Sequence, residues 1–135
     1  AQGAKLSYFK YSDFGVDMMN NGIVFNSDYA KKNPDAVRSF VRVTKEAFEM
    51  AKANPKAAID ALIKQLPQQE RNRAVLMRQL ELSMDSMETT NTRGKPLGVM
   101  DPRDWEATQN LLVKYAGLPR AVPVDTLYTN EYLPK

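Results

Sequence analysis

The sequence contains no cysteine and no histidine among its 135 residues. The absence of cysteine excludes disulfides, thiol chemistry and zinc sites with cysteine ligands. The absence of histidine removes the usual general base and the commonest transition-metal ligand. Glycine-rich phosphate loops, nucleophile elbows and calcium-binding loops are missing as well. We therefore expect no catalytic residue, no metal site, no cofactor and no enzymatic activity.

Long apolar runs and strong net charge are also missing. Hydrophobic residues make up 43% of the chain and charged residues 26%, which is ordinary for a globular protein. The longest apolar runs are only a few residues, so no membrane span is expected. The net charge is +3, and the basic residues alternate with acidic ones. No nucleic-acid partner is expected, because such binding needs a clustered basic face.

Helix signals dominate the middle of the chain. Asparagine or aspartate followed by proline favours a helix start, because the first side chain caps free N–H groups and proline fits the first turn. Such pairs occur at Asn33-Pro34, Asn54-Pro55 and Asp101-Pro102. The pattern predicts helices over 34–53, 55–66 and 101–117, a further helix over 68–87 and a short helical turn over 28–33. Trp105 is expected in the core or on the surface.

The segment from Tyr8 to Asn26 has a different character, with aromatic residues around a glycine. Its composition predicts a strand over 5–11, a turn at Ser12–Gly15 in which Gly15 has positive φ, a second turn at 20–22 and a strand over 22–26.

The same opening segment is the candidate binding site. Its aromatic side chains can stack on a flat ligand, and its carboxylates and amides offer hydrogen-bonding groups. These side chains are Tyr8, Phe9, Tyr11, Phe14, Asp13, Asp17, Asn20 and Asn21. The residues alone leave a second interpretation open: a strand with core aromatics at alternate positions, joined to two polar turns.

Three stretches together resemble a known family. They are "YSDFGV" leading to "NGIVFN", the run "NPDAVRSFVRVTKEAFEMAKANPKAA", and "MDPRDWEATQNLLVKYAGL" closing with "VDTLYTNEYLP". Their order and spacing resemble the later part of the periplasmic substrate-binding proteins of ABC importers. The similarity is to the NMT1/THI5-like branch, which includes nitrate, sulfonate, taurine and thiamine-pyrimidine-precursor binders, and it covers about residues 5–134.

The resemblance implies an α/β fold, as the C-terminal half of a two-lobed binding protein, mostly helical with a few strands. Within a single partial domain over 1–135, crossover strands would occupy 5–26, the helical part of the first lobe 27–117, and a wrapping tail 118–135. The chain would be a piece of a longer periplasmic protein. No signal-peptide pattern is found in it.

The resemblance also implies a function. The chain would bind a small solute, an aromatic or heterocyclic precursor, for an ABC-type uptake system. Its partners would be that small-molecule ligand, the ABC permease in the membrane, and either the missing N-terminal half or a second copy. Tyr11 and Phe14 would stack on the ligand, Asp13 would form hydrogen bonds or bind a cation, and Asn20 and Asn21 would be secondary contacts.

Two alternatives remain open at this stage. The first is a small helical interaction module without a ligand cleft, whose grooves would be formed by the 34–53 and 68–87 helices, with methionines facing a partner helix. It predicts an exposed methionine-rich patch. The second is a carboxylate-based enzyme that uses Asp13 or Asp17, and it predicts that these acids lie in a closed pocket.

Overall fold

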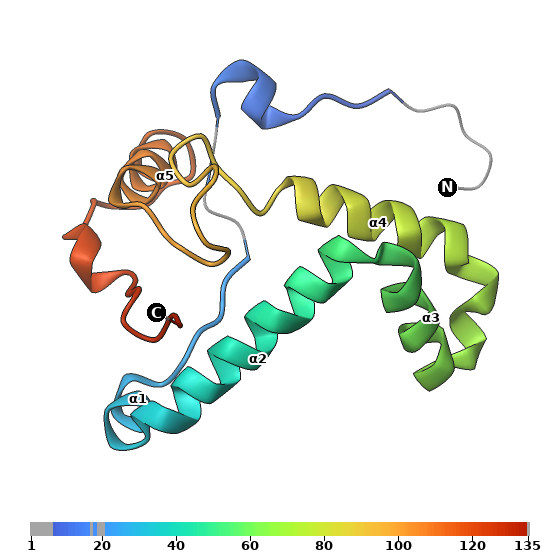
Figure 1. The fold of residues 1–135 in the computed structure, drawn as a ribbon. Helices are drawn as coiled ribbons and strands as arrows, with labels where there is room; N and C mark the ends of the chain where they lie inside the picture. The colour runs from blue at the N-terminus through green and yellow to red at the C-terminus, as the bar shows by residue number, and fades with distance from the viewer. Residues whose placement is uncertain (1–6, 17, 19–20, 135) are drawn as a thin grey trace.

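The structure is a computed structural model that describes residues 7–16, 18 and 21–134. It is mostly helical (Figure 1). The elements in chain order are the 3-10 helix η1 (Tyr11–Phe14), α1 (Ser27–Lys32), α2 (Pro34–Ala53), α3 (Pro55–Gln65), the 3-10 helix η2 (Pro67–Asn72), α4 (Arg73–Asp85), α5 (Pro102–Tyr115) and the 3-10 helix η3 (Val124–Thr126).

The predicted helix starts are confirmed, and two of the three predicted caps form. The Asn54 side chain accepts a hydrogen bond from the Ala57 backbone N–H at 3.0 Å, and Asp101 accepts one from Arg103 at 3.1 Å. Asn33 behaves differently, because its side-chain amide donates to the Tyr29 carbonyl at 3.1 Å. Asn33 therefore closes α1 instead of capping α2.

The predicted strands are not found. In the described part of the chain, residues 7–10 and 21–26 have no regular structure and residues 11–14 form η1, so no strand supports the α/β expectation there. A strand needs a neighbour to pair its backbone groups, and even a two-stranded hairpin is marginal in water. Among the described residues, these β-favouring segments have no neighbouring strand. Val24 is 92% exposed, and Phe25 packs edge-on against Phe40 of α2, with ring centroids 5.8 Å apart.

The helix predicted over 68–87 is divided. Residues Pro67–Asn72 form η2, and the α-helix begins only at Arg73. Pro67 opens the element, and the backbone N–H of Gln69 bonds to the Leu66 carbonyl three residues back, which is the 3-10 spacing. Arg73 ties the junction together, with ion pairs to Glu70 and to Asp60 on α3.

Helix α3 is the centre of the helical part. It packs against α2 on one side and against α4 on the other, while α1 packs against α2 (Figure 1). The buried apolar core of the described residues is small, and it consists of Ala30, Val37 and Ile59. On α2 only Val37 belongs to this buried core, since Phe40 is 55% and Phe48 38% exposed.

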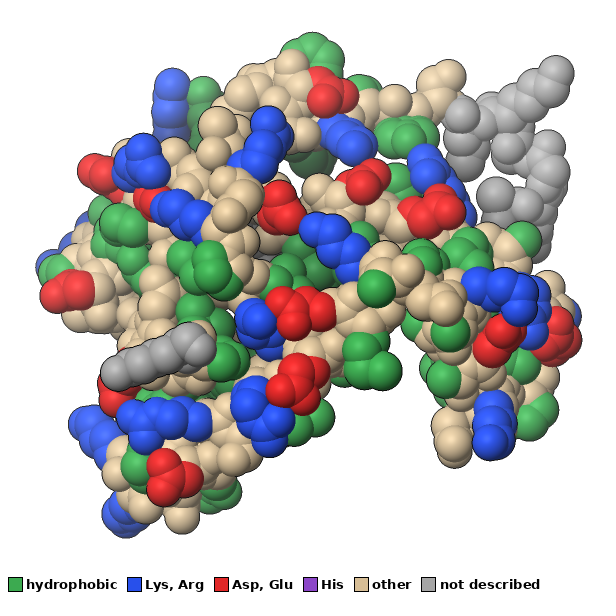
Figure 2. All heavy atoms as spheres, in the orientation of Figure 1, with side chains coloured by type: hydrophobic (Ala, Val, Ile, Leu, Met, Phe, Trp, Pro, Cys, Tyr) green, Lys and Arg blue, Asp and Glu red, His purple; other side chains and the backbone are tan. Residues whose placement is uncertain are grey.

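The accessible surface shows how open this arrangement is. It measures 10598 Å² for a chain of 15.3 kDa. A folded monomer of that mass is expected to expose about 7,100 Å². Figure 2 shows hydrophobic side chains on the visible face among the charged ones. Much apolar surface that a complete globular domain would cover is therefore accessible.

A buried polar cluster fastens the loop after α4 to α5. The Thr89 hydroxyl donates to Asp104 Oδ2 at 2.6 Å, and the Asn91 amide donates to Asp104 Oδ1 at 2.7 Å. The Thr92 hydroxyl accepts from the Thr89 backbone N–H at 2.8 Å. Asp104 is only 3% exposed, and both of its oxygens are satisfied, as a buried carboxylate requires.

A second carboxylate, Asp101, holds the start of α5. It accepts from Lys95 Nζ at 2.9 Å and from Arg103 Nε at 2.8 Å, and it also caps the helix. The hydrogen bonds from Arg103 and Lys95 lower the pKa of Asp101 below its ordinary value. The charged form of Asp101 is thus part of the folded structure.

The tail after α5 is fixed by specific contacts, as the predicted wrapping requires. The Gln109 side chain exchanges two hydrogen bonds with the Val122 backbone, at 2.7 and 3.0 Å. Asn130 does the same with Met100, at 2.9 and 3.0 Å. Trp105 stacks on Tyr128, with ring centroids 5.6 Å apart and planes 4° apart. Half-buried Trp105 therefore serves packing, as predicted.

Among the described residues, no helix combines the length and the apolar content that crossing a bilayer requires.

Val37 carries much of the apolar core, so Val37→Ala should destabilise the chain by about 2 kcal/mol. Urea unfolding followed by circular dichroism measures this change. Val75→Ala on α4 is the matched control, because Val75 is 50% exposed and its truncation should stay within about 0.5 kcal/mol. Equal effects of the two variants would contradict the assigned core.

Asp101 should make the free energy of unfolding depend on pH in the acidic range. Its pKa is lower in the folded than in the unfolded chain, so its contribution is present above about pH 4 and is lost as the pH falls through the folded pKa. Asp101→Asn keeps a capping oxygen but loses the charge. As the pH is lowered from about 5 to 2, the urea midpoint of the variant should decrease less than that of the wild type. Asp125→Asn, at an exposed carboxylate, should keep the wild-type slope, and a wild-type slope in Asp101→Asn would refute the assignment.

Candidate functional site

The candidate site is built on residues 7–16, called the aromatic segment below. Its turn forms η1, as the predicted turn chemistry indicates. Asp13 Oδ2 accepts from the Lys10 backbone N–H at 3.3 Å, which closes the start of the turn. Gly15 ends it with φ of 75°, a left-handed conformation that glycine adopts without strain. The predicted positive φ at Gly15 is confirmed.

Three aromatic rings gather on this turn. Phe9 lies edge-on to Tyr11, with centroids 6.1 Å apart, and edge-on to Phe14, with centroids 5.6 Å apart. Such edge-to-face pairs are favourable because the positive edge of one ring meets the negative face of the other. The three side chains are nevertheless about 70% exposed: Phe9 69%, Tyr11 72% and Phe14 71%. The rings fix one another's orientation and leave large apolar faces open to a ligand.

The predicted site residues are only partly brought together. Tyr11, Asp13 and Phe14 share η1, and all three are exposed. Asn21 is exposed on the irregular chain that follows, and Asn20 and Asp17 lie outside the described residues. Phe9 is among the candidate side chains but has no predicted role toward the ligand, and it is the central ring of the cluster. The spacing of two residues between Phe9 and Tyr11 is the sequence signal that indicates a role for Phe9 in the site.

One described hydrogen bond connects the aromatic segment to the helices. Arg78 Nη2 on α4 donates to the Tyr8 hydroxyl at 3.3 Å, and Arg78 Nη1 pairs with Glu81 at 3.1 Å. The bonds to Glu81 and then to Tyr8 raise the pKa of Arg78, so the guanidinium stays charged. Both ends of the contact are exposed, and a surface contact of this kind stabilises weakly. The turn is thus internally ordered but lightly attached.

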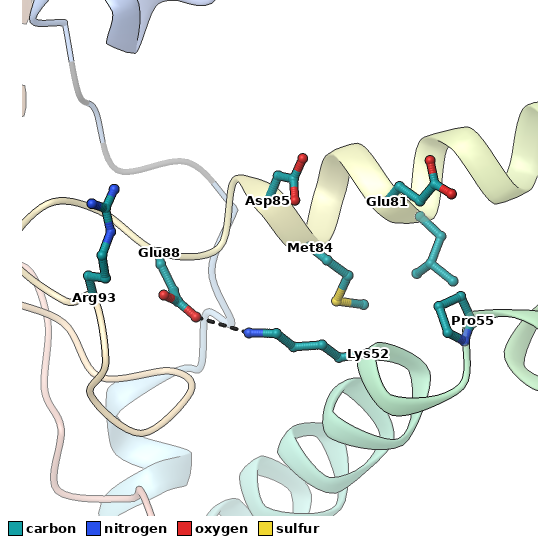
Figure 3. A pocket seen from close by; sticks show the side chains of 8 residues that line it. Lys52, Pro55, Glu81, Met84, Asp85, Glu88 and Arg93 are labelled. Atoms are coloured by element: carbon teal, nitrogen blue, oxygen red, sulfur yellow. Dashed lines mark hydrogen bonds and ion pairs between the residues drawn. The ribbon is translucent and has the colours of Figure 1, made fainter.

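A pocket lies between α2 and α4 and is called the α2–α4 pocket here (Figure 3). Its volume is about 390 Å³, and its lining consists of Lys52, Pro55, Leu80, Glu81, Met84, Asp85, Glu88 and Arg93. Lys52 bridges to Glu88 at 3.0 Å across it, and this bond lowers the pKa of Glu88. None of the predicted site residues lies there.

The surroundings of the acidic side chains decide whether they could support catalysis or bind a metal ion. Asp13 is exposed and bonds to backbone, which is not the closed pocket that carboxylate catalysis requires. In the part of the chain with assigned positions, no group of three or more His, Cys, Asp or Glu side chains is arranged to hold a metal ion. The arrangement on η1 suits stacking and hydrogen bonding.

Comparison with known proteins found two similarities. Residues 1–58 match the family described as NMT1/THI5 like. Over 134 residues, 98% of this chain, the sequence is 28% identical to the riboflavin-binding protein RibY of Chloroflexus aurantiacus. The chain spans 38% of the length of that relative. No solved structure matches.

These matches confirm the predicted resemblance to the NMT1/THI5-like binding proteins. The family match contains the whole aromatic segment, and the relative extends the similarity through the helices to the tail.

Proposed function

We propose that this chain is part of a solute-binding protein and that its aromatic segment forms one wall of the site for a small, flat heterocyclic ligand. The exposed three-ring cluster on η1 carries this proposal. Apolar surface gathered in one place on a protein commonly marks a binding site, and aromatic faces stack on flat rings. The relative is itself named a binding protein for riboflavin, which contains a flat three-ring heterocycle.

Each residue of the segment has a proposed role. Tyr11 and Phe14 stack on the ligand, and Phe9 holds both rings in orientation through its edge-on contacts. Asp13 has one oxygen committed to the Lys10 N–H, and it offers its remaining lone pairs to ligand N–H or O–H groups. Asn20 and Asn21 are the proposed amide contacts on the following stretch.

Charge favours an uncharged ligand over a small anion. The η1 turn carries Asp13 and the cation Lys10 directly precedes it, so residues 7–16 have no net positive charge to attract an anion. A carboxylate beside the ligand repels nitrate-like or sulfonate-like groups. Riboflavin carries no net charge at neutral pH, so it is the appropriate first probe.

The remaining parts of the proposal concern the whole protein. The chain spans 38% of its relative, so we propose that an N-terminal half supplies the rest of the ligand envelope and the sheet strands. Residues 5–26 would then be the crossover, 27–117 the helical part of a lobe and 118–135 the wrapping tail of one partial domain. The complete protein would act outside the cytoplasm and deliver its solute to an ABC permease.

Binding by the α4 methionines is less well supported. Met77 and Met84 on α4, and Met87 just after it, are half-buried, whereas the interaction-module alternative requires an exposed methionine-rich patch. Catalysis is also not proposed, since the relative is named for binding and Asp13 is exposed.

Loss of a stacking ring should weaken ligand binding. Riboflavin fluorescence should be quenched saturably by the chain, and Tyr11→Ala should raise the dissociation constant about tenfold, because one stacked ring contributes roughly 1–3 kcal/mol. Tyr115→Ala is the matched control, since Tyr115 is 71% exposed on α5, and it should bind like the wild type. Absence of saturable quenching, or unchanged affinity after loss of both Tyr11 and Phe14, would refute the proposed site.

Asp13 should discriminate against anions. The wild-type chain should bind riboflavin more tightly than its phosphate ester, and Asp13→Asn should narrow that difference about threefold, as expected for charges some 7–10 Å apart in a watery site. The same quenching assay measures both ligands. Asp28→Asn is a control at an exposed aspartate on α1. If the ratio of the two affinities is the same in Asp13→Asn and the wild type, Asp13 does not face the ligand.

A further inference from the structure

Residues 21–26 form an irregular stretch that begins with an asparagine directly followed by a glycine. The stretch has no helix or strand, and in Figure 1 it is the extended trace that leads into α1. Asn21 and Gly22 are both exposed, and no hydrogen bond joins either of them to another described residue. The Asn21 side-chain amide and the Gly22 backbone N–H are therefore open to water, without a partner in the described part of the chain.

Two adjacent amide groups in this arrangement can react with each other. The Gly22 backbone nitrogen attacks the carbonyl carbon of the Asn21 side chain and forms a new C–N bond. The bond from that carbon to the side-chain nitrogen breaks, and ammonia leaves with the proton of Gly22. Water then opens the resulting five-membered succinimide at either carbonyl, which yields aspartate or isoaspartate. The whole reaction consumes one water and releases one ammonia, and it needs no oxidant or other reagent.

The residue after the asparagine and the local structure decide how easily the ring closes. Glycine has no Cβ to crowd the attacking nitrogen, and its backbone adopts more conformations than that of any other residue. A backbone N–H or a side-chain amide that is committed to a hydrogen bond is held away from the geometry of attack. The chain contains a single Asn-Gly pair, at Asn21-Gly22, and this pair meets both conditions.

Two of the other asparagines are followed by proline. Pro34 and Pro55 follow Asn33 and Asn54. Because proline has no backbone N–H, it does not supply the attacking group. These two asparagines therefore do not react in this way, whatever their exposure.

The remaining described asparagines are held by the fold. Asn110 lies inside α5, where the backbone N–H groups belong to the helix. Hydrogen bonds fix the side chains of Asn26, Asn72, Asn91 and Asn130. Asn21 thus differs from every other described asparagine both in the residue that follows it and in its surroundings.

We propose that Asn21-Gly22 is a site of spontaneous deamidation, at which Asn21 converts to aspartate and isoaspartate before the other described asparagines react. Either product lowers the net charge of +3 by one, and it adds a carboxylate to the connection between the aromatic segment and α1. Isoaspartate also lengthens the main chain of this connection by one carbon. Because Asn21 is a proposed ligand contact, any effect on binding rests on the proposed function, whereas the reaction itself does not.

Peptide mapping by mass spectrometry, during incubation of the 135-residue chain at neutral pH and body temperature, tests this proposal without any ligand. Each conversion raises the mass of a peptide by about 1 Da, because NH₂ is replaced by OH, and fragmentation locates the converted residue. Gly22→Ala is the matched variant. An added Cβ would meet no described atom within 4 Å, and the backbone is outside the left-handed region. This variant should convert about fivefold more slowly.

The same measurement in guanidinium chloride separates the effect of the fold from that of the sequence. Asn21 should convert at the same rate in the folded and the unfolded chain, within about twofold, because no described contact restrains it. Asn26 is the internal control, since unfolding breaks its hydrogen bond to the Tyr29 N–H and should speed its conversion. Conversion of Asn21 more than about tenfold slower in the folded chain, or earlier conversion at Asn26 or Asn130, would overturn the proposal.

Discussion

Apolar surface that this chain does not cover by itself is the constraint behind its main features. Only Ala30, Val37 and Ile59 form its buried apolar core among the described residues. The helices are therefore fixed to a large extent by polar contacts: side-chain caps, the buried Asp104 cluster, and the hydrogen bonds that hold the tail on α5. The aromatic segment remains open, and its exposed rings have the composition of a binding surface.

The tail and the aromatic segment are attached to the helices in different ways. The tail is fastened to α5 by paired backbone and side-chain hydrogen bonds and by the stacked rings of Trp105 and Tyr128. The aromatic segment is ordered within itself by Asp13, Gly15 and the ring contacts, but Arg78 alone joins it to α4 among the described contacts. A binding wall that adapts to its ligand needs this combination of local order and light attachment.

The sequence predicted what depends on neighbours along the chain. Asn54, Asp101 and the prolines after them located two helices, and the glycine in "SDFG" located the turn at the candidate site. The strand predictions failed because strand pairing depends on a distant segment, and no local sequence pattern identifies that segment. The Asp104 cluster escaped prediction for the same reason, since Thr89 lies 15 residues away. Phe9 was visible in the sequence, but its central position among the rings depends on the path of the backbone.

The account places the ligand on the aromatic segment and not in the α2–α4 pocket, and nuclear magnetic resonance tests this choice directly. Riboflavin would be titrated into isotopically labelled chain while the aromatic and methyl signals are followed. We expect the largest shifts at the rings of Phe9, Tyr11 and Phe14, because a stacked heterocycle changes the magnetic field at those rings. Shifts concentrated at Leu80 and Met84, with the three rings unchanged, would contradict the account and assign binding to the pocket.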